Sequence, residues 1–76
     1  MHLTPIEFAL LRALALNRGL LMTHRKLLAE VWGPEFVDAT PLLRTHIANL
    51  RRKLQAGAER PRFIRTDSGI GYRFTA

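Results

Sequence analysis

Three pairs of start and stop signals divide this 76-residue chain into helices. Threonine favours a helix cap, proline the first helical position, and glycine the left-handed residue that ends a helix. The start signals are Thr4-Pro5, Thr23 and Thr40-Pro41. The stop signals are Gly19, Gly33-Pro34 and Gly57. We therefore expect three helices, with only the residues after Gly57 left for other structure.

The first helix, expected over Pro5–Asn17, begins with a capping box in which Thr4 and Glu7 satisfy each other's backbone amides. Apolar residues then occupy nearly every side of the helix. One face carries Ile6, Leu10, Ala13 and Leu14, and the other apolar residues are Phe8, Leu11 and Leu16. A helix that is apolar all round is a buried one, so we expect this helix to be central and the most buried.

The second helix, of roughly ten residues, starts after Thr23. Its buried stripe is Leu27, Leu28, Val31 and Trp32. Its first turn holds the basic residues His24, Arg25 and Lys26. Cations there oppose the helix dipole, whereas the backbone amides of a helix start bind phosphate. The three basic groups fit either an anion that docks on this end or a solvated first turn.

The connection Gly33–Ala39 combines apolar Phe36 and Val37 with acidic Glu35 and Asp38. Connections in small domains are usually shorter or more polar. We expect Phe36 to pack against the core. The alternative is an exposed loop that contacts another protein.

The third helix, expected over Thr40–Ala56, has two different faces. At ~100° per residue its core stripe is Leu43, Ile47, Leu50 and Leu54. The opposite side carries Thr45, Ala48, Asn49 and Arg52, with Arg44 and Arg51 on one shoulder and His46 and Lys53 on the other. No acidic residue lies between Pro41 and Gly57. The pairs of opposite charge that a solvated helix face usually carries are therefore missing.

This outer face suits a DNA groove. The small side chains of Thr45 and Ala48 let the helix backbone approach the groove floor. Asparagine pairs with adenine, arginine pairs with guanine, and the thymine methyl accepts apolar contact. Cations on the shoulders of the helix can reach phosphates. The face therefore indicates a helix that lies against nucleic acid.

The positive charge is confined to one part of the chain. Residues 1–43 sum to zero, so the whole net charge of +6 lies in residues 44–76. A one-sided basic field attracts polyanions, nucleic acid first and anionic membranes second, although solubility alone could explain a basic excess. The exposed face of the basic helix lacks the large apolar residues that a membrane surface would need.

Two β-rich segments, Arg62–Thr66 and Tyr72–Thr75, flank the turn-forming residues DSGIG. This pattern predicts a β-hairpin. Phe63, Tyr72 and Phe74 are expected to point into the core and Arg73 to point away from it.

Other functions lack the residues they need. The chain has no cysteine, which excludes disulfides, thiol nucleophiles and thiolate metal sites and fits a reducing compartment. Ser68 is the one serine, and the three histidines lack ligand spacing. No apolar run approaches the ~20 residues that cross a bilayer. We therefore expect no catalysis, no cofactor, no metal and no membrane partner.

The order helix, short helix, long helix and hairpin is that of a winged helix-turn-helix, an α+β fold. The motifs LTPIEFALL, THRKLLAEVWG, HIANLRRKL and IRTDSGIGYRF resemble the DNA-binding effector domain of OmpR/PhoB-type response regulators over nearly the whole chain. VWGP, LLR and TDSGIGYRF are most similar to the KdpE branch, which controls potassium-transport operons. The resemblance implies a C-terminal wing, Arg62–Thr75. It also implies that the chain starts at the last strand of an N-terminal sheet that is otherwise missing.

The resemblance implies roles by position, with the third helix as a recognition helix in the major groove and the wing on the backbone or in the minor groove. Residues nearest base edges would be Arg44, Thr45, Ala48, Asn49 and Arg52. Other residues would contact the DNA backbone, and they include His24 and Arg25 from the basic start of the second helix. The full set is His24, Arg25, His46, Arg51, Thr66, Ser68, Gly69 and Tyr72. Many relatives place an arginine where this chain has Ser68, which favours wing contacts to phosphate over minor-groove insertion.

The resemblance also implies partners. The loop residues Glu35, Phe36, Val37 and Asp38 would contact RNA polymerase. Family members bind direct repeats as head-to-tail pairs, so the isolated domain is expected to be a monomer. Residues 1–76 are expected to form one effector domain, a fragment of a cytoplasmic bacterial two-component response regulator with a separate receiver domain. One alternative is a stand-alone DNA-binding protein without a receiver domain. The other is a winged-helix module that binds an acidic protein partner.

Overall fold

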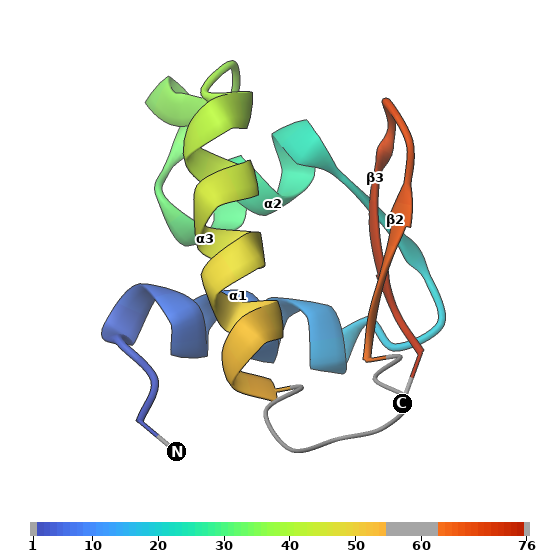
Figure 1. Cartoon of the computed structure of the whole chain (residues 1–76). Coiled ribbons are helices and arrows are strands. Elements are labelled where there is room, and N and C mark those ends of the chain that lie inside the picture. Colours follow the sequence, from blue (N-terminus) through green and yellow to red (C-terminus); the bar gives the residue numbers. More distant parts are fainter. Residues whose placement is uncertain (1, 55–62, 76) are drawn as a thin grey trace.

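The computed structural model describes residues 2–54 and 63–75. In chain order, the elements in these ranges are α1 (Pro5–Leu16), β1 (Leu21–Thr23), α2 (His24–Val31), the 3-10 helix η1 (Pro34–Phe36), α3 (Thr40–Leu54), β2 (Ile64–Asp67) and β3 (Gly71–Phe74) (Figure 1). The predicted winged helix is confirmed. The expected helix end at Ala56 and Gly57 and the expected hairpin start at Arg62 lie outside the described residues.

The start of α1 is the capping box that the sequence predicts. The Glu7 amide donates to Thr4 Oγ1 at 3.1 Å, and the Thr4 amide donates to Glu7 Oε1 at 2.9 Å. Gly19 has a φ of +83° where the chain leaves the helix, as expected for the terminating glycine. Residues 2–4 form no strand. The strand expected at the start of the chain is therefore absent from residues 2–4.

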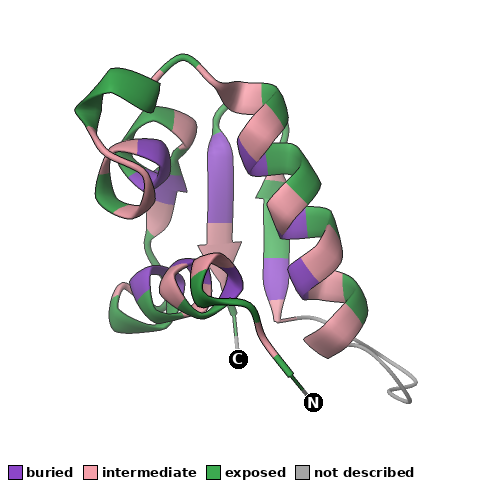
Figure 2. Cartoon of the chain, turned by 90° about the vertical axis from the view of Figure 1, so that its left-hand side faces the viewer, coloured by how far each residue is buried: buried purple, intermediate pink, exposed green. Residues whose placement is uncertain are grey.

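Helix α1 has the largest share of buried residues of the three α-helices, as expected, but it is buried on one side only. Leu10 and Leu14 have no exposed surface, whereas Phe8 is 58% exposed and Leu16 is 70% exposed. The neighbours of α1 among the described residues are α2, α3 and β3, and these cover one side of the helix (Figures 1 and 2). Apolar composition therefore overestimated the burial of α1.

A third strand, β1, joins the predicted hairpin. The sheet is antiparallel with the order β1-β3-β2, and Met22 of β1 lies opposite Tyr72 of β3. Three residues are too few to show strand alternation, and their partner lies at the far end of the sequence, so the pattern did not reveal β1. Asp67 and Gly71, expected in the turn, are the end of β2 and the start of β3.

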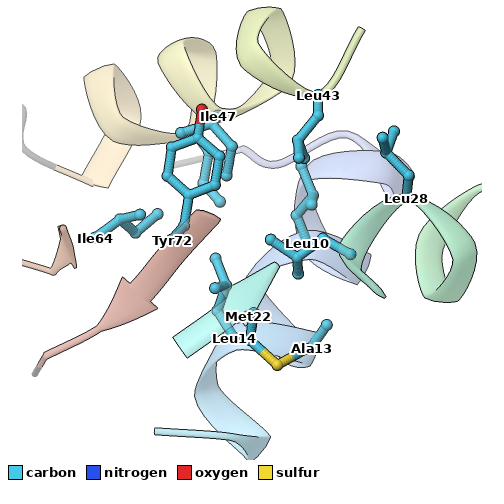
Figure 3. Close-up of a cluster of buried hydrophobic side chains, with 11 residues drawn as sticks. Leu10, Ala13, Leu14, Met22, Leu28, Leu43, Ile47, Ile64 and Tyr72 are labelled. Atoms are coloured by element: carbon cyan, nitrogen blue, oxygen red, sulfur yellow. The ribbon is translucent and has the colours of Figure 1, made fainter. Parts of the chain in front are cut away.

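The core lies between the helices and the sheet (Figure 3). Leu43, Ile47 and Leu50 of α3 are fully buried and Leu54 packs against them, which confirms the predicted stripe. Tyr72 is buried as expected. Phe63 and Phe74 are half-buried at the edge of the core, and so is Arg73, which was expected to point away.

The start of α3 and the length of α2 differ slightly from expectation. Thr40 is the first residue of α3 and not its cap, because the Ala39 carbonyl accepts from the amides of Leu42 and Leu43. Helix α2 has eight residues, with the side chain of Thr23 accepting from the Lys26 amide as predicted. Val31 and Trp32 of its expected stripe are half-buried.

Candidate nucleic-acid interface

The outer face of α3 is displayed to solvent because the opposite stripe is anchored in the core (Figure 2). Four of the five expected base-reading residues are exposed, and Asn49 is half-buried among them. The exposed four are Arg44, Thr45, Ala48 and Arg52. The structure therefore brings the whole expected set onto one side of one helix.

Three polar side chains on this face are held by local hydrogen bonds. The Thr45 hydroxyl donates to the Pro41 carbonyl at 3.1 Å, which turns its proton toward the helix. Arg52 Nη1 donates to Asn49 Oδ1 at 2.9 Å. An amide oxygen has two lone pairs, so Asn49 Oδ1 can still accept from an adenine amino group while Asn49 Nδ2 donates to adenine N7.

The basic start of α2 offers few backbone donors to an anion. The His24 amide donates to the Ile70 carbonyl, and the Lys26 amide donates to Thr23. The Arg25 side chain forms an exposed ion pair with Asp38 at 2.6 Å. Two of the first three helix amides are therefore used within the protein, and any anion at this end would depend mainly on the side chains.

The far end of α3 is tied to the wing. Arg51 donates to the Ile64 carbonyl through Nε at 3.1 Å and through Nη2 at 2.9 Å. The same Nη2 also donates to Thr66 Oγ1. The guanidinium lies over the ring of Tyr72, with Cζ 5.5 Å from the ring centroid. Sequence reasoning placed Arg51, Thr66 and Tyr72 separately on the DNA backbone and did not foresee that they contact one another.

The wing turn is open to solvent. Ser68 and Gly69 are exposed, Ile70 is 52% exposed, and Gly69 has a φ of +75°. Tyr72, by contrast, is only 4% exposed. Thr66, Ser68 and Gly69 thus have surface available for the backbone contacts expected of them, whereas Tyr72 has very little.

His46 and Lys53, on the other shoulder of α3, are both engaged within the protein. His46 Nδ1 lies 2.9 Å from the Leu42 carbonyl, which can only accept, so Nδ1 carries the hydrogen. The edge of its ring meets Trp32 of the α2 end at 5.1 Å between centroids. Lys53 Nζ lies 2.6 Å from Glu7 Oε1. Sequence reasoning missed both contacts, because each joins residues of different helices.

Glu7 is the one buried acid among residues 2–54 and 63–75, and its pKa is shifted. The hydrogen bond from Lys53 and then the bond from the Thr4 amide hold the pKa of Glu7 below its ordinary value, and desolvation opposes them in part. The group is therefore a carboxylate at neutral pH. It neutralises Lys53 on one shoulder of α3.

The loop after α2 differs from expectation at Phe36. This side chain, expected against the core, is 40% exposed, and Glu35 and Asp38 beside it are exposed as well. The short helix η1 holds Phe36 through its amide, which donates to the Gly33 carbonyl. The alternative expectation, an exposed contact loop, describes these residues better.

Within residues 2–54 and 63–75, no helix has the length and apolar character needed to cross a membrane. The same ranges contain no cluster of three or more histidine, cysteine, aspartate or glutamate residues that could hold a metal ion.

Comparison with known proteins agrees with this geometry. KdpE of Escherichia coli K12, the KDP operon transcriptional regulatory protein, is 51% identical over 73 residues, which cover 96% of this chain and 32% of that protein. The transcriptional regulatory protein KdpE of Mycobacterium tuberculosis H37Rv is 49% identical over 75 residues, 99% of this chain and 33% of its own length. The chain thus spans about a third of these relatives.

A solved structure has the same fold. The DNA-binding domain of E. coli CadC superposes with a TM-score of 0.89 and 26% identity, over 100% of this chain and 71% of that domain. Residues 1–74 match the family described as "Transcriptional regulatory protein, C terminal". The chain therefore belongs to this OmpR/PhoB-type family of DNA-binding domains, and its similarity to two KdpE proteins confirms the expected branch.

Proposed function

We propose that this chain binds double-stranded DNA sequence-specifically to regulate transcription, with no catalytic step of its own. Helix α3 enters the major groove and the β2–β3 wing lies on the backbone beside it. The observation that carries the proposal is the exposed outer face of α3, which holds small and amide side chains among arginines and no acid. The core stripe of α3 is buried, so this face is the one that DNA can reach.

The roles of the side chains follow from their chemistry. Asn49 pairs with adenine and Arg44 or Arg52 with guanine, while the methyl groups of Thr45 and Ala48 meet thymine. The bond from Arg52 to Asn49 orients the amide before DNA arrives. The proposed contacts with the DNA backbone are His24, Arg25, His46, Thr66, Ser68, Gly69 and Tyr72. Phosphate contacts of this kind set the register of the protein on the duplex.

The test is a salt series of binding titrations with a preferred duplex, selected from random sequences, and with single-base variants of it. Asn49→Ala and Arg44→Ala are each expected to lower specific affinity by ~1–3 kcal/mol and to relax preference at one base pair. The matched control is Arg18→Ala, because Arg18 is an exposed arginine just after α1. This substitution should leave the specific affinity and the base preference unchanged. Equal losses on every sequence would contradict base reading, and failure of the wild type to bind any duplex would contradict the function.

The exposed loop supports a second contact. We propose that Glu35, Phe36, Val37 and Asp38 meet RNA polymerase, because Phe36 is exposed between acidic residues and is not used by the core. Phe36→Ala should leave DNA affinity unchanged and lower transcription from a reconstituted promoter. Binding of an acidic protein in place of DNA, with α3 as the contact surface, would instead favour the interaction-module alternative.

We also propose that the chain serves as the output domain of a cytoplasmic bacterial response regulator of the KdpE type, acting at a potassium-transport operon. The names and greater lengths of the two KdpE relatives support this. The domain is expected to be a monomer alone and to occupy direct repeats as a head-to-tail pair. Sedimentation velocity with duplexes carrying one or two half-sites, spaced about one helical turn apart, would count the bound copies.

A further inference from the structure

Arg51 is held by several contacts within the protein, and a direct contact with a DNA phosphate would break them. It lies on the shoulder of α3 and is half-buried. Its Nε and Nη2 atoms converge on the Ile64 carbonyl, and Nη2 also reaches Thr66. Both acceptors belong to β2, one of the two edge strands of the described sheet. A single side chain therefore connects the proposed recognition helix to the strand that leads into the wing turn.

The geometry requires arginine and not merely a positive charge. The guanidinium is planar and presents its donors in a fixed fork. Here one edge of that fork meets two oxygens of β2 while its face covers the Tyr72 ring of β3. Thr66 and Tyr72 lie opposite each other in the register of the hairpin. Arg51 thus touches both strands of the wing at one level and holds them against α3.

We propose that Arg51 is a positioning residue, which sets the wing at a fixed distance and angle from α3 so that both meet the same duplex. This inference rests on the proposed DNA binding. It replaces the role that sequence position suggested, a direct phosphate contact, because the Nε and Nη2 donors of Arg51 are directed to the wing. Ile47, Ile64 and Tyr72 belong to one buried cluster, which holds the hairpin on the core (Figure 3). The hydrogen bonds of Arg51 to β2 restrict how the hairpin turns.

The test compares Arg51→Lys with Arg51→Gln. Lysine keeps the charge, and a lysine ammonium contacts phosphate as a point charge, but it lacks the planar fork. A positioning role predicts that both variants lose affinity alike, several-fold, and that both lose hydroxyl-radical protection where the wing lies while protection by α3 persists. Arg18→Lys, an exposed arginine outside the interface, is the matched control and should resemble the wild type.

Two outcomes would overturn the inference. If Arg51→Lys keeps wild-type affinity while Arg51→Gln loses affinity and about one unit of salt slope, Arg51 is a phosphate ligand. If both variants weaken binding but keep the wing footprint, the wing does not depend on Arg51. Titrations are run well below the thermal midpoint of each variant, so that a loss of stability does not imitate either result.

A measurement without DNA separates this inference from the proposed function. Residual dipolar couplings of backbone amides report the orientation of β2 and β3 relative to α3 in the free protein. Arg51→Lys is expected to change the couplings of residues 64–74 and to leave those of α1 unchanged. Unchanged wing couplings would overturn the positioning role. Changed couplings in a protein that binds no duplex would preserve the positioning of the wing and contradict only the DNA function.

Discussion

At the scale of single residues, Glu7 shows how one side chain serves two elements. Its carboxylate accepts from the Thr4 amide in the capping box of α1 and from Lys53 near the end of α3. The capping box is a local feature that spacing in the sequence reveals. The ion pair is not local, because it depends on how α1 and α3 cross.

The lowered pKa of Glu7 predicts a pH-dependent contribution to stability. The folded state binds the Glu7 proton more weakly than the unfolded state does, so the contribution is fully present above the unfolded-state pKa, roughly 4.3, and is lost as pH falls through the lower folded value. Urea unfolding of Glu7→Gln should therefore show less stability than the wild type at pH 7, and the difference should shrink below pH 4.

Glu30→Gln is the matched control for this experiment, since Glu30 is an exposed acid on α2. Its unfolding free energy should follow that of the wild type across the pH range. If the difference in unfolding free energy between the wild type and Glu7→Gln stays constant with pH, the charge of Glu7 does not contribute to stability.

At the scale of elements, α1 and α3 are opposite cases. The third helix has a polar outer face, so its pattern of leucines identifies the buried side without ambiguity. The first helix is apolar on most sides, so its pattern does not say which side is buried. Only the positions of α2, α3 and β3 decide that Leu14 is inside and Leu16 outside.

This difference predicts opposite results for one substitution at two positions of α1. Leu14→Ala is expected to lower the free energy of unfolding by ~2–5 kcal/mol, because it leaves a cavity in the core. Leu16→Ala is expected to change it by less than ~0.5 kcal/mol, since that side chain is 70% exposed. Denaturant unfolding followed by circular dichroism compares the two. Equal losses would mean that Leu16 is covered in solution.

At the scale of the whole molecule, the sheet connects the first third of the chain to its end. Strand β1 pairs with β3, and Gly71 faces it so closely that a Cβ atom there would lie 2.1 Å from the Met22 carbonyl oxygen. The Gly19 amide also donates to the Phe74 carbonyl. The wing is therefore braced from both sides, by β1 on one and by Arg51 on the other.

Gly71→Ala is expected to force β1 and β3 apart and to cost ~1–3 kcal/mol of stability, as other overpacked sites do. The measurement is thermal unfolding together with amide hydrogen exchange, which should accelerate in residues 21–23. Ser68→Ala, in the exposed turn of the same hairpin, is the control and should leave both unchanged. Unchanged exchange in β1 for Gly71→Ala would contradict the close pairing.

The sequence was sufficient wherever the deciding interaction lies within a few residues. The caps Thr4 and Thr23, the terminators Gly19 and Gly33, the amphipathic stripe of α3 and the hairpin turn depend on neighbours three or four positions away or on a single backbone conformation, and the structure confirms them. The motif resemblance added the winged-helix order and the family. Helical spacing placed Thr45, Ala48, Asn49 and Arg52 on the outer face of the third helix. The resemblance added that these residues and Arg44 would lie nearest base edges.

Tertiary structure decided what depends on residues distant in the sequence. Strand β1, the exposed side of α1, the exposure of Phe36 and the ion pair of Lys53 each require knowing which elements meet. The same holds for Arg51. Its position on α3 predicts a cation near DNA, and only the structure shows that it contacts Ile64, Thr66 and Tyr72 of the wing. Helical spacing determined which side chains α3 presents to solvent. The packing of the elements determined which of these side chains already bind other residues of the protein.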